Sequence, residues 1–118
     1  MTREEILERG MQAPLYAGVL TDATHRGEGR NRDCGDLVHF DFKIVNGVIT
    51  HARHSCQACV LTTAMTDCLC ELVEGKTLES IKLPDPFSVF REPILPQRRE
   101  CIQLPWELAR VSLHLSQS

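Results

Sequence analysis

The sequence predicts an α+β fold, in which a three-stranded antiparallel sheet carries helices packed on one face, within a single domain of residues 1–118. Residues 37–45 alternate apolar and polar side chains, as a half-buried strand does. The pair Asn46-Gly47 follows directly, and this dipeptide is the strongest short-range hairpin signal. From residue 60 the apolar period becomes helical. Strands followed by helices indicate a two-layer α+β arrangement.

The N-terminal elements are predicted in the following order. Residues 2–11 form a helix, because Thr2 and Glu5 have the spacing of a capping box. Residues 19–30 form a first strand that ends in a glycine-rich, polar stretch. Residues 37–45 form the second strand, and residues 48–54 return beside it after the hairpin turn.

The C-terminal elements are mostly helical. Residues 60–73 form a long helix that Gly75 ends, and Thr77 caps a short helix reaching Ile81. Residues 83–97 contain four prolines and form an irregular connector. Pro105 is expected in the first turn of a last helix. The buried side of that helix is expected to consist of Leu104, Leu108, Val111 and Leu115.

The amino-acid composition favours a soluble globular protein over a membrane or nucleic-acid-binding one. The chain has 118 residues, of which 42% are hydrophobic and 25% charged, and its net charge is −3. These values are typical of a soluble globular domain, and the acidic balance argues against a general nucleic-acid binder. The sequence has neither a secretory signal pattern nor an apolar run of membrane-spanning length. We therefore expect a cytoplasmic protein with no membrane or nucleic-acid partner.

Six cysteines in a chain of this length indicate metal or thiol chemistry, since disulfides are rare in the cytoplasm. Cys34, Cys59 and Cys101 are expected at junctions between elements. Cys59 would begin the long helix, where the helix dipole favours the thiolate. Gly35 would let Cys34 and Asp36 face one point. The residues alone leave two alternatives, a thiolate-rich site or scattered buried thiols.

Five segments of the sequence, in order along residues 4–115, have recognisable patterns, and three of them contain the cysteines just described. The segments are Ala13-Pro14 through Gly18, Asn31-Arg32-Asp33-Cys34-Gly35-Asp36, Ile49 through Cys59, Gly75-Lys76-Thr77-Leu78, and Arg99-Glu100-Cys101-Ile102-Gln103-Leu104-Pro105-Trp106. Together they resemble the IscU, SufU and NifU N-terminal family of iron–sulfur cluster assembly scaffold proteins.

The resemblance implies a SufE/IscU-like fold and a non-enzymatic scaffold. Such a scaffold receives sulfur from a cysteine desulfurase, assembles a transient [2Fe–2S] cluster, and transfers it to apo iron–sulfur proteins. The implied ligands of the cluster are Cys34, Asp36, Cys59 and Cys101. Three thiolates and a carboxylate also suit tetrahedral zinc, which isolated protein could carry instead.

Two alternatives to the scaffold role follow from the same residues. One is a SufU-like, zinc-dependent sulfurtransferase that accepts a persulfide from a desulfurase, with Cys34 or Cys101 as the acceptor. The other is a structural zinc domain in which the metal serves folding alone. Asp36 could also cap its own loop in an Asx turn and not bind metal.

Five further residues near the predicted ligands or on the long helix are assigned roles from the sequence. Cys56 forms a Cys-x-x-Cys pattern with Cys59, so it is an additional ligand, a redox partner or an exposed loop thiol. Glu100, beside Cys101, could be an extra ligand. Cys68 is expected to pack in the core, whereas Cys70 is expected off the apolar stripe. His54 is expected to be packed or hydrogen-bonded.

Overall fold

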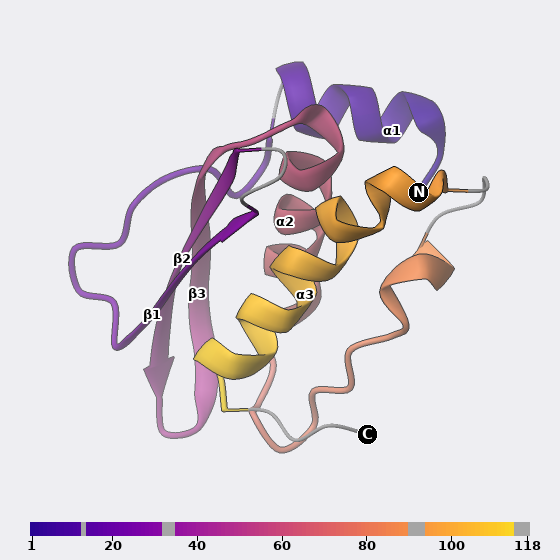
Figure 1. Ribbon diagram of the computed structural model, residues 1–118. Coiled ribbons are helices and arrows are strands. Elements are labelled where there is room, and N and C mark those ends of the chain that lie inside the picture. The colour runs from indigo at the N-terminus through magenta and orange to yellow at the C-terminus, as the bar shows by residue number, and fades with distance from the viewer. Residues whose placement is uncertain (13, 32–34, 90–93, 115–118) are drawn as a thin grey trace.

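A computed structural model describes residues 1–12, 14–31, 35–89 and 94–114, and it contains one sheet in the order β1-β2-β3 with antiparallel neighbours (Figure 1). The strands are β1 His25–Asn31, β2 Asp36–Val45 and β3 Val48–Gln57. The predicted three-stranded antiparallel sheet is therefore confirmed. The first strand is shorter than predicted, since it starts at His25 and not at residue 19.

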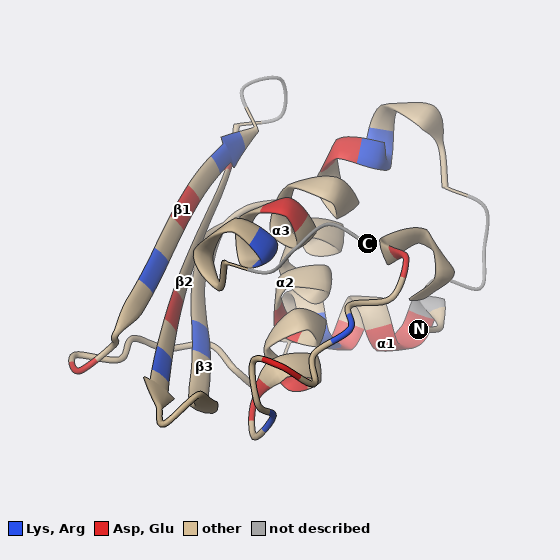
Figure 2. Ribbon diagram, turned by 90° about the horizontal axis from the view of Figure 1, so that it is seen from below, with Lys and Arg blue, Asp and Glu red and all other residues tan. Residues whose placement is uncertain are grey.

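The helices lie on one face of this sheet, as Figure 2 shows with the sheet edge-on. They are α1 Arg3–Leu7, α2 Val60–Val73 and α3 Arg99–Ser112. A π-helical turn, Glu8–Gln12, continues α1, and short 3-10 helices occupy Pro86–Val89 and Pro96–Arg98. Thr2 and Glu5 form the predicted capping box at the start of α1. Among the residues that the structure describes, no helix has the length and apolar character needed to cross a membrane.

The hairpin between β2 and β3 sets the register of the sheet. Asn46 and Gly47 have φ angles of 52° and 76°, the left-handed conformation that this two-residue turn requires. A β-bulge between Lys43 and Ile44 then shifts the pairing by one residue, so that Val38 lies opposite Cys56. Val38 is fully buried in the core, and directly paired residues point to the same face of a sheet. The side chain of Cys56 therefore faces the helical layer and not the outer face.

Helix α2 lies at the centre of the molecule and is covered on several sides. Its Met65, Leu69 and Val73 belong to the main hydrophobic core, and α1, α3 and β3 all pack against it. Cys68 is buried, as predicted. The prediction for Cys70 is wrong, because this thiol is fully buried in the same core. A helix covered all round buries residues that a one-sided apolar stripe would expose.

Helix α3 packs closely on β1 at the two strand glycines. A Cβ added to Gly27 would lie 1.8 Å from the Ser112 side-chain oxygen, and one added to Gly29 would lie 3.2 Å from a Leu104 methyl group. Glycine at these positions therefore permits the close approach of helix and strand. Helix α3 and strand β1 run in opposite directions, since Gly27 lies near Ser112 and Gly29 near Leu104. The first turn of α3 therefore lies near the end of β1 and the start of β2.

Three predictions about the C-terminal half are wrong. Residues 77–81 form no helix; the Thr77 hydroxyl instead donates to Ser80 in a turn. Helix α3 starts at Arg99, so Pro105 lies inside it and not in its first turn. Its buried face contains Ile102, Trp106 and Ala109. The predicted face fails at Val111, which is 60% exposed, while Leu115 lies outside the described residues.

The N-terminal segment is fastened to the core by Asp67, a fully buried carboxylate on α2. Asp67 accepts hydrogen bonds from Arg9 at 2.8 Å and from the backbone amides of Leu15 and Tyr16 at 3.2 and 2.7 Å. It also lies 2.9 Å from the ring of His54 on β3. Burial alone would raise the pKa of Asp67, but these hydrogen bonds outweigh it and lower the pKa to about 2.

We predict that Asp67 makes the stability of the fold sensitive to acid. Its pKa is lowered in the folded state, so its contribution is present above the usual value of 3.8 and is lost as the pH falls toward 2. Between pH 6 and pH 2 the wild type should lose about 2 kcal/mol more unfolding free energy than Asp67→Asn. Denaturant unfolding at each pH measures this, with the exposed-site variant Glu79→Gln as control. Equal losses in wild type and Asp67→Asn would contradict the assignment.

Candidate functional site

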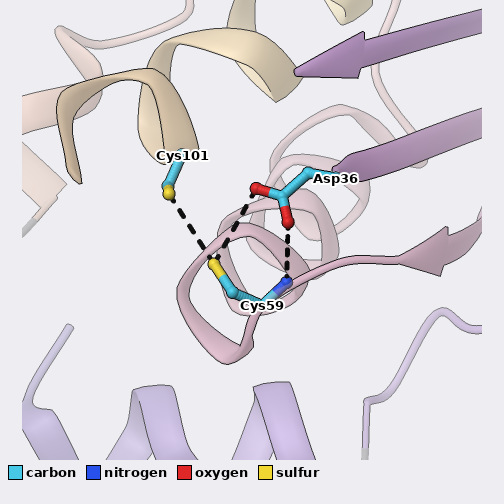
Figure 3. A group of neighbouring side chains, drawn as sticks. All are labelled: Asp36, Cys59 and Cys101. Carbon is cyan, nitrogen blue, oxygen red and sulfur yellow. Dashed lines mark hydrogen bonds between the residues drawn. The ribbon is translucent and has the colours of Figure 1, made fainter. Parts of the chain in front are cut away.

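Three potential ligands from three separate elements meet at one end of the sheet (Figure 3). Asp36 begins β2, Cys59 immediately precedes α2, and Cys101 lies in the first turn of α3. Their donor atoms all lie within 4.8 Å of one another. The Cys59 and Cys101 sulfurs are 3.7 Å apart, and the Cys59 sulfur is 3.9 Å from Asp36 Oδ2. The fold thus gathers a carboxylate and two thiols that are far apart in the sequence.

The start of α2 is held against β2 by the Asp36 carboxylate. Cys59 is the N-cap residue of α2, and its sulfur accepts from the backbone amide of Thr62 at 3.5 Å. The backbone amide of Cys59 itself donates to Asp36 Oδ1 at 3.0 Å. One cysteine therefore contributes both an N-cap acceptor and a donor to the neighbouring carboxylate. These contacts orient the Cys59 sulfur toward the space that it shares with Asp36 and Cys101.

Thr62 is a site residue that the sequence did not reveal. Its hydroxyl donates to Asp36 Oδ2 at 3.0 Å and lies 3.3 Å from the Cys59 sulfur. The Thr62 side chain is fully buried, so water cannot replace it as a partner for the carboxylate. Thr62 lies in the first turn of α2, and the only sequence signal was a threonine three residues after a cysteine that begins a helix.

Burial and neighbouring acidic groups control protonation of the Cys101 thiol. Burial is the largest factor raising the pKa of Cys101 to about 11, and the nearby Cys59 and Asp36 raise it further, while a hydrogen bond with Thr62 opposes them. If the Cys59 and Cys101 thiols both ionised, their negative charges would lie close together. A bound cation offsets that repulsion, and metal binding to thiols releases their protons for this reason.

The separation of the two sulfurs suits a single tetrahedral metal. With metal–sulfur bonds of about 2.3 Å and tetrahedral angles, two thiolates on one zinc ion lie about 3.8 Å apart. The Cys59 and Cys101 sulfurs are 3.7 Å apart. An ionised carboxylate has about four lone-pair positions, so the hydrogen bonds from the Cys59 amide and the Thr62 hydroxyl leave Asp36 able to bind a cation as well. The described donors therefore fit a metal in both spacing and chemistry.

The structure brings together three of the four predicted ligands. Cys34, also a predicted sulfur acceptor, lies outside the described residues. The Asp36 carboxylate accepts from residues at the start of α2, which supports its place in the site over the Asx-turn alternative. Glu100 is exposed in the first turn of α3 and is not among the converging donors.

The structure also tests three predictions about neighbouring residues. Cys101 was expected just before the last helix, but it lies inside the first turn of α3. His54 is buried and hydrogen-bonded to Asp67, which confirms the expectation of a packed or hydrogen-bonded histidine. Cys56 is half-buried on β3, close to His54, and is not an exposed loop thiol.

Comparison with known proteins gives consistent matches. A family model described as the NifU-like N terminal domain matches residues 1–115. The iron–sulfur cluster assembly scaffold protein IscU of Aquifex aeolicus is 30% identical over 114 residues, covering 93% of this chain and 72% of that protein. IscU of Thermotoga maritima is 33% identical over 81 residues, which is 69% of this chain and 56% of that protein. The match thus spans little more than half of the Thermotoga protein.

Solved structures share the fold. A structure from Fervidobacterium islandicum, described as a candidate iron–sulfur cluster assembly scaffold protein for the SUF system, superposes with a TM-score of 0.77 at 24% identity, covering 93% of this chain and 94% of that one. A nitrogen-fixing NifU-like protein (N-terminal) from Brucella abortus gives 0.69 at 17% identity, covering 94% and 90%. At these identities the likeness shows the α+β architecture.

We predict that removing the Thr62 hydroxyl destabilises the site. Thr62→Val keeps the shape of the side chain but leaves a buried oxygen of Asp36 without its donor, which costs about 1–3 kcal/mol. The neighbouring Thr63→Val, on a half-buried position of the same helix, is the control and should change stability by less. Denaturant unfolding of both variants checks this. Equal stability of Thr62→Val and wild type would contradict the role assigned to the hydroxyl.

Proposed function

The chain belongs to the NifU-like N-terminal domain family, and on this basis we propose that it is an iron–sulfur cluster assembly scaffold. It assembles a [2Fe–2S] cluster as cargo on Cys34, Asp36, Cys59 and Cys101 and transfers the cluster to apo iron–sulfur proteins. Residues 1–118 act as one scaffold domain, working in the cytoplasm without a nucleic-acid partner. The observation that carries the proposal is the convergence of Asp36, Cys59 and Cys101 at the meeting point of three elements.

The donor set suits a cluster that must be released. Cysteine thiolates are the usual ligands of iron–sulfur clusters. A carboxylate is a harder ligand, and so a weaker partner for cluster iron than a fourth thiolate would be. Asp36 is held by hydrogen bonds from Cys59 and Thr62, which position its oxygens without occupying all their lone pairs. In this proposal Asp36 keeps the cluster labile enough to transfer.

Cys34 completes the proposed ligand set through its place in the chain. It lies two residues before Asp36, so covalent geometry alone keeps the two α-carbons within roughly 7 Å. The cluster's sulfur comes from a cysteine desulfurase, and Cys34 or Cys101 receives it as a persulfide. Cys101 is fully buried, whereas Cys59 is half-buried. For Cys101 to accept sulfur, its surroundings must therefore open to admit the donor.

A second function is favoured by the spacing of the two described thiols. Their 3.7 Å separation suits one tetrahedral ion, as a zinc-dependent sulfur acceptor would need. In this alternative the chain is a SufU-like sulfurtransferase that works with a cysteine desulfurase. Zinc held by these donors would lower the pKa of its thiol ligands, and the acceptor, Cys34 or Cys101, would attack the persulfide as a thiolate. The zinc and the cluster would use the same donors, so the two functions differ in whether the chain passes on a cluster or a sulfur atom.

We predict that cluster assembly requires the converging thiols. Wild type is reconstituted anaerobically with ferrous iron, cysteine and a desulfurase, then mixed with apo-ferredoxin. Visible charge-transfer absorption should form in wild type and move to the acceptor, and it should be lost in Cys34→Ala, Cys59→Ala and Cys101→Ala. Cys68→Ala removes a buried thiol of α2 distant from the ligand set and serves as the matched control. Asp36→Ala should hold its cluster longer and transfer it more slowly.

The same experiment separates the two functions. Cluster formation that persists in Cys59→Ala and Cys101→Ala would rule out the proposed site. Tightly bound zinc, absence of a cluster and acceleration of the desulfurase would replace the scaffold with the sulfurtransferase. Loss of the cluster in Asp36→Ala would contradict the proposed role of the carboxylate in keeping the cluster labile.

A further inference from the structure

The side chains of Cys56, His54 and Asp67 contact one another in succession. None of the three belongs to the group of converging donors Asp36, Cys59 and Cys101. The Cys56 sulfur is 3.6 Å from His54 Nδ1, and His54 Nε2 is 2.9 Å from Asp67 Oδ1. His54 and Asp67 are buried, while Cys56 is half-buried at the open end of the row. Nucleophile, base and orienting carboxylate in this order form the arrangement by which enzymes activate a cysteine.

The hydrogen bonds of Asp67 fix the proton on His54. Asp67 is ionised above a pKa of about 2, and an ionised carboxylate only accepts hydrogen bonds. His54 Nε2 must therefore donate to it. In the neutral imidazole the remaining lone pair is then on Nδ1, which faces the Cys56 thiol. Arg9 and two backbone amides hold the carboxylate from its other sides, so the ring cannot easily turn.

A base is needed because this thiol does not ionise readily by itself. Burial is the largest factor that raises the pKa of Cys56 to about 11. At neutral pH the free thiolate is therefore scarce. A lone pair within hydrogen-bond reach of the S–H removes this obstacle, because the proton can leave as the sulfur attacks.

The position of Cys56 connects it with the proposed cluster site. Cys56 pairs with Val38, two residues from Asp36 along β2 and on the same face of the sheet. Such diagonal neighbours lie about 7–8 Å apart. Asp36 is also among the groups that raise the pKa of Cys56, so the two side chains interact electrostatically. Cys56 nevertheless lies outside the group of donors that converge within 4.8 Å.

We propose that Cys56 is an acceptor of sulfane sulfur, with His54 as its general base and Asp67 as the residue that positions the base. The substrate class is a persulfide, R–S–SH, and the proposal rests on the proposed function for the source of that sulfur. The reaction places a sulfur atom beside the ligand site without using a ligand thiol. It gives a function to the Cys-x-x-Cys pattern that differs from metal binding and from a disulfide.

The chemical step balances without an added oxidant or reductant. The Cys56 proton moves to His54 Nδ1 while the Cys56 sulfur attacks the terminal sulfur of R–S–SH. The S–S bond of the donor breaks, a new S–S bond forms on Cys56, and the leaving thiolate takes the proton from His54 to become R–SH. The transferred sulfur keeps its oxidation state, and the leaving thiol is replaced by the attacking one.

The test uses the full chain and glutathione persulfide as the probe. After short incubation, persulfides are tagged and located by fragment-ion mass spectrometry. We expect modification at Cys56 in the wild type, faster than at the buried thiols Cys68 and Cys70. In His54→Gln the rate at Cys56 should fall by roughly tenfold or more, since general-base catalysis contributes at least that much. His51→Gln, an exposed histidine on the same strand, is the matched control and should keep the wild-type rate.

Either of two results of this assay would overturn the proposal. One is the absence of persulfide at Cys56 when the probe modifies other thiols. The other is an unchanged rate at Cys56 in a folded His54→Gln protein. If His54→Gln does not fold, the ¹⁵N-histidine spectrum of the wild type at pH 7 decides. A proton on Nε2 alone supports the base, whereas a proton on Nδ1 contradicts it.

Failure of this proposal is separable from failure of the scaffold function. Cys56→Ser lacks the acceptor thiol but keeps all four proposed ligands, so it should bind ferrous iron or zinc as the wild type does. Sulfur transfer to Cys56 in a protein that assembles no cluster would contradict the scaffold function and support Cys56 as a sulfur acceptor. Cluster assembly with no persulfide at Cys56 would support the scaffold function and contradict the role of Cys56.

Discussion

The hydrogen bond from the Cys59 backbone amide to the Asp36 carboxylate sets the geometry of the site before any metal or cluster binds. It joins the start of α2 to the start of β2, two points that the chain itself does not hold together. At the N-terminus of a helix the first amides have no partner within the helix, so a buried carboxylate there satisfies one of them and is favoured by the helix dipole. A structural need of α2 thus places a carboxylate beside the Cys59 thiol.

The third element reaches this point because β1 has glycines where α3 crosses it. With Gly27 and Gly29 the helix lies close enough for its first turn, and Cys101 with it, to reach the start of α2. Thr62 lies beside the Cys59 sulfur and donates to Asp36. The site is therefore built from ordinary requirements of helix capping and close packing. These same contacts keep the Cys59 and Cys101 sulfurs close together.

The sequence predicted those features that depend on local signals. The alternation in β2, the Asn46-Gly47 turn and the apolar period of α2 are each encoded within a few residues, and α2 has the predicted bounds of residues 60–73. The converging donors were expected because the resemblance to the scaffold family pointed to particular positions. Cys34 lies outside the described residues, so its role as a ligand stays a prediction.

The features that the sequence did not predict depend on contacts between distant parts of the chain. Thr62 matters only because Asp36 lies beside it, and Asp67 only because the N-terminal segment and His54 surround it. Cys70 is buried because α2 is covered from several sides, which no single-helix pattern records. Pro105 was expected to open a helix, but the 3-10 turn Pro96–Arg98 already starts α3 upstream of it.

X-ray absorption at the zinc edge of the zinc-loaded protein tests whether one metal atom is bound by the residues that meet at this end of the sheet. We expect four ligands, three sulfurs at about 2.3 Å and one oxygen at about 2.0–2.2 Å. We also expect the loss of one sulfur in Cys59→Ala. A zinc ion bound by histidine nitrogens, or an unchanged spectrum in Cys59→Ala, would contradict this site.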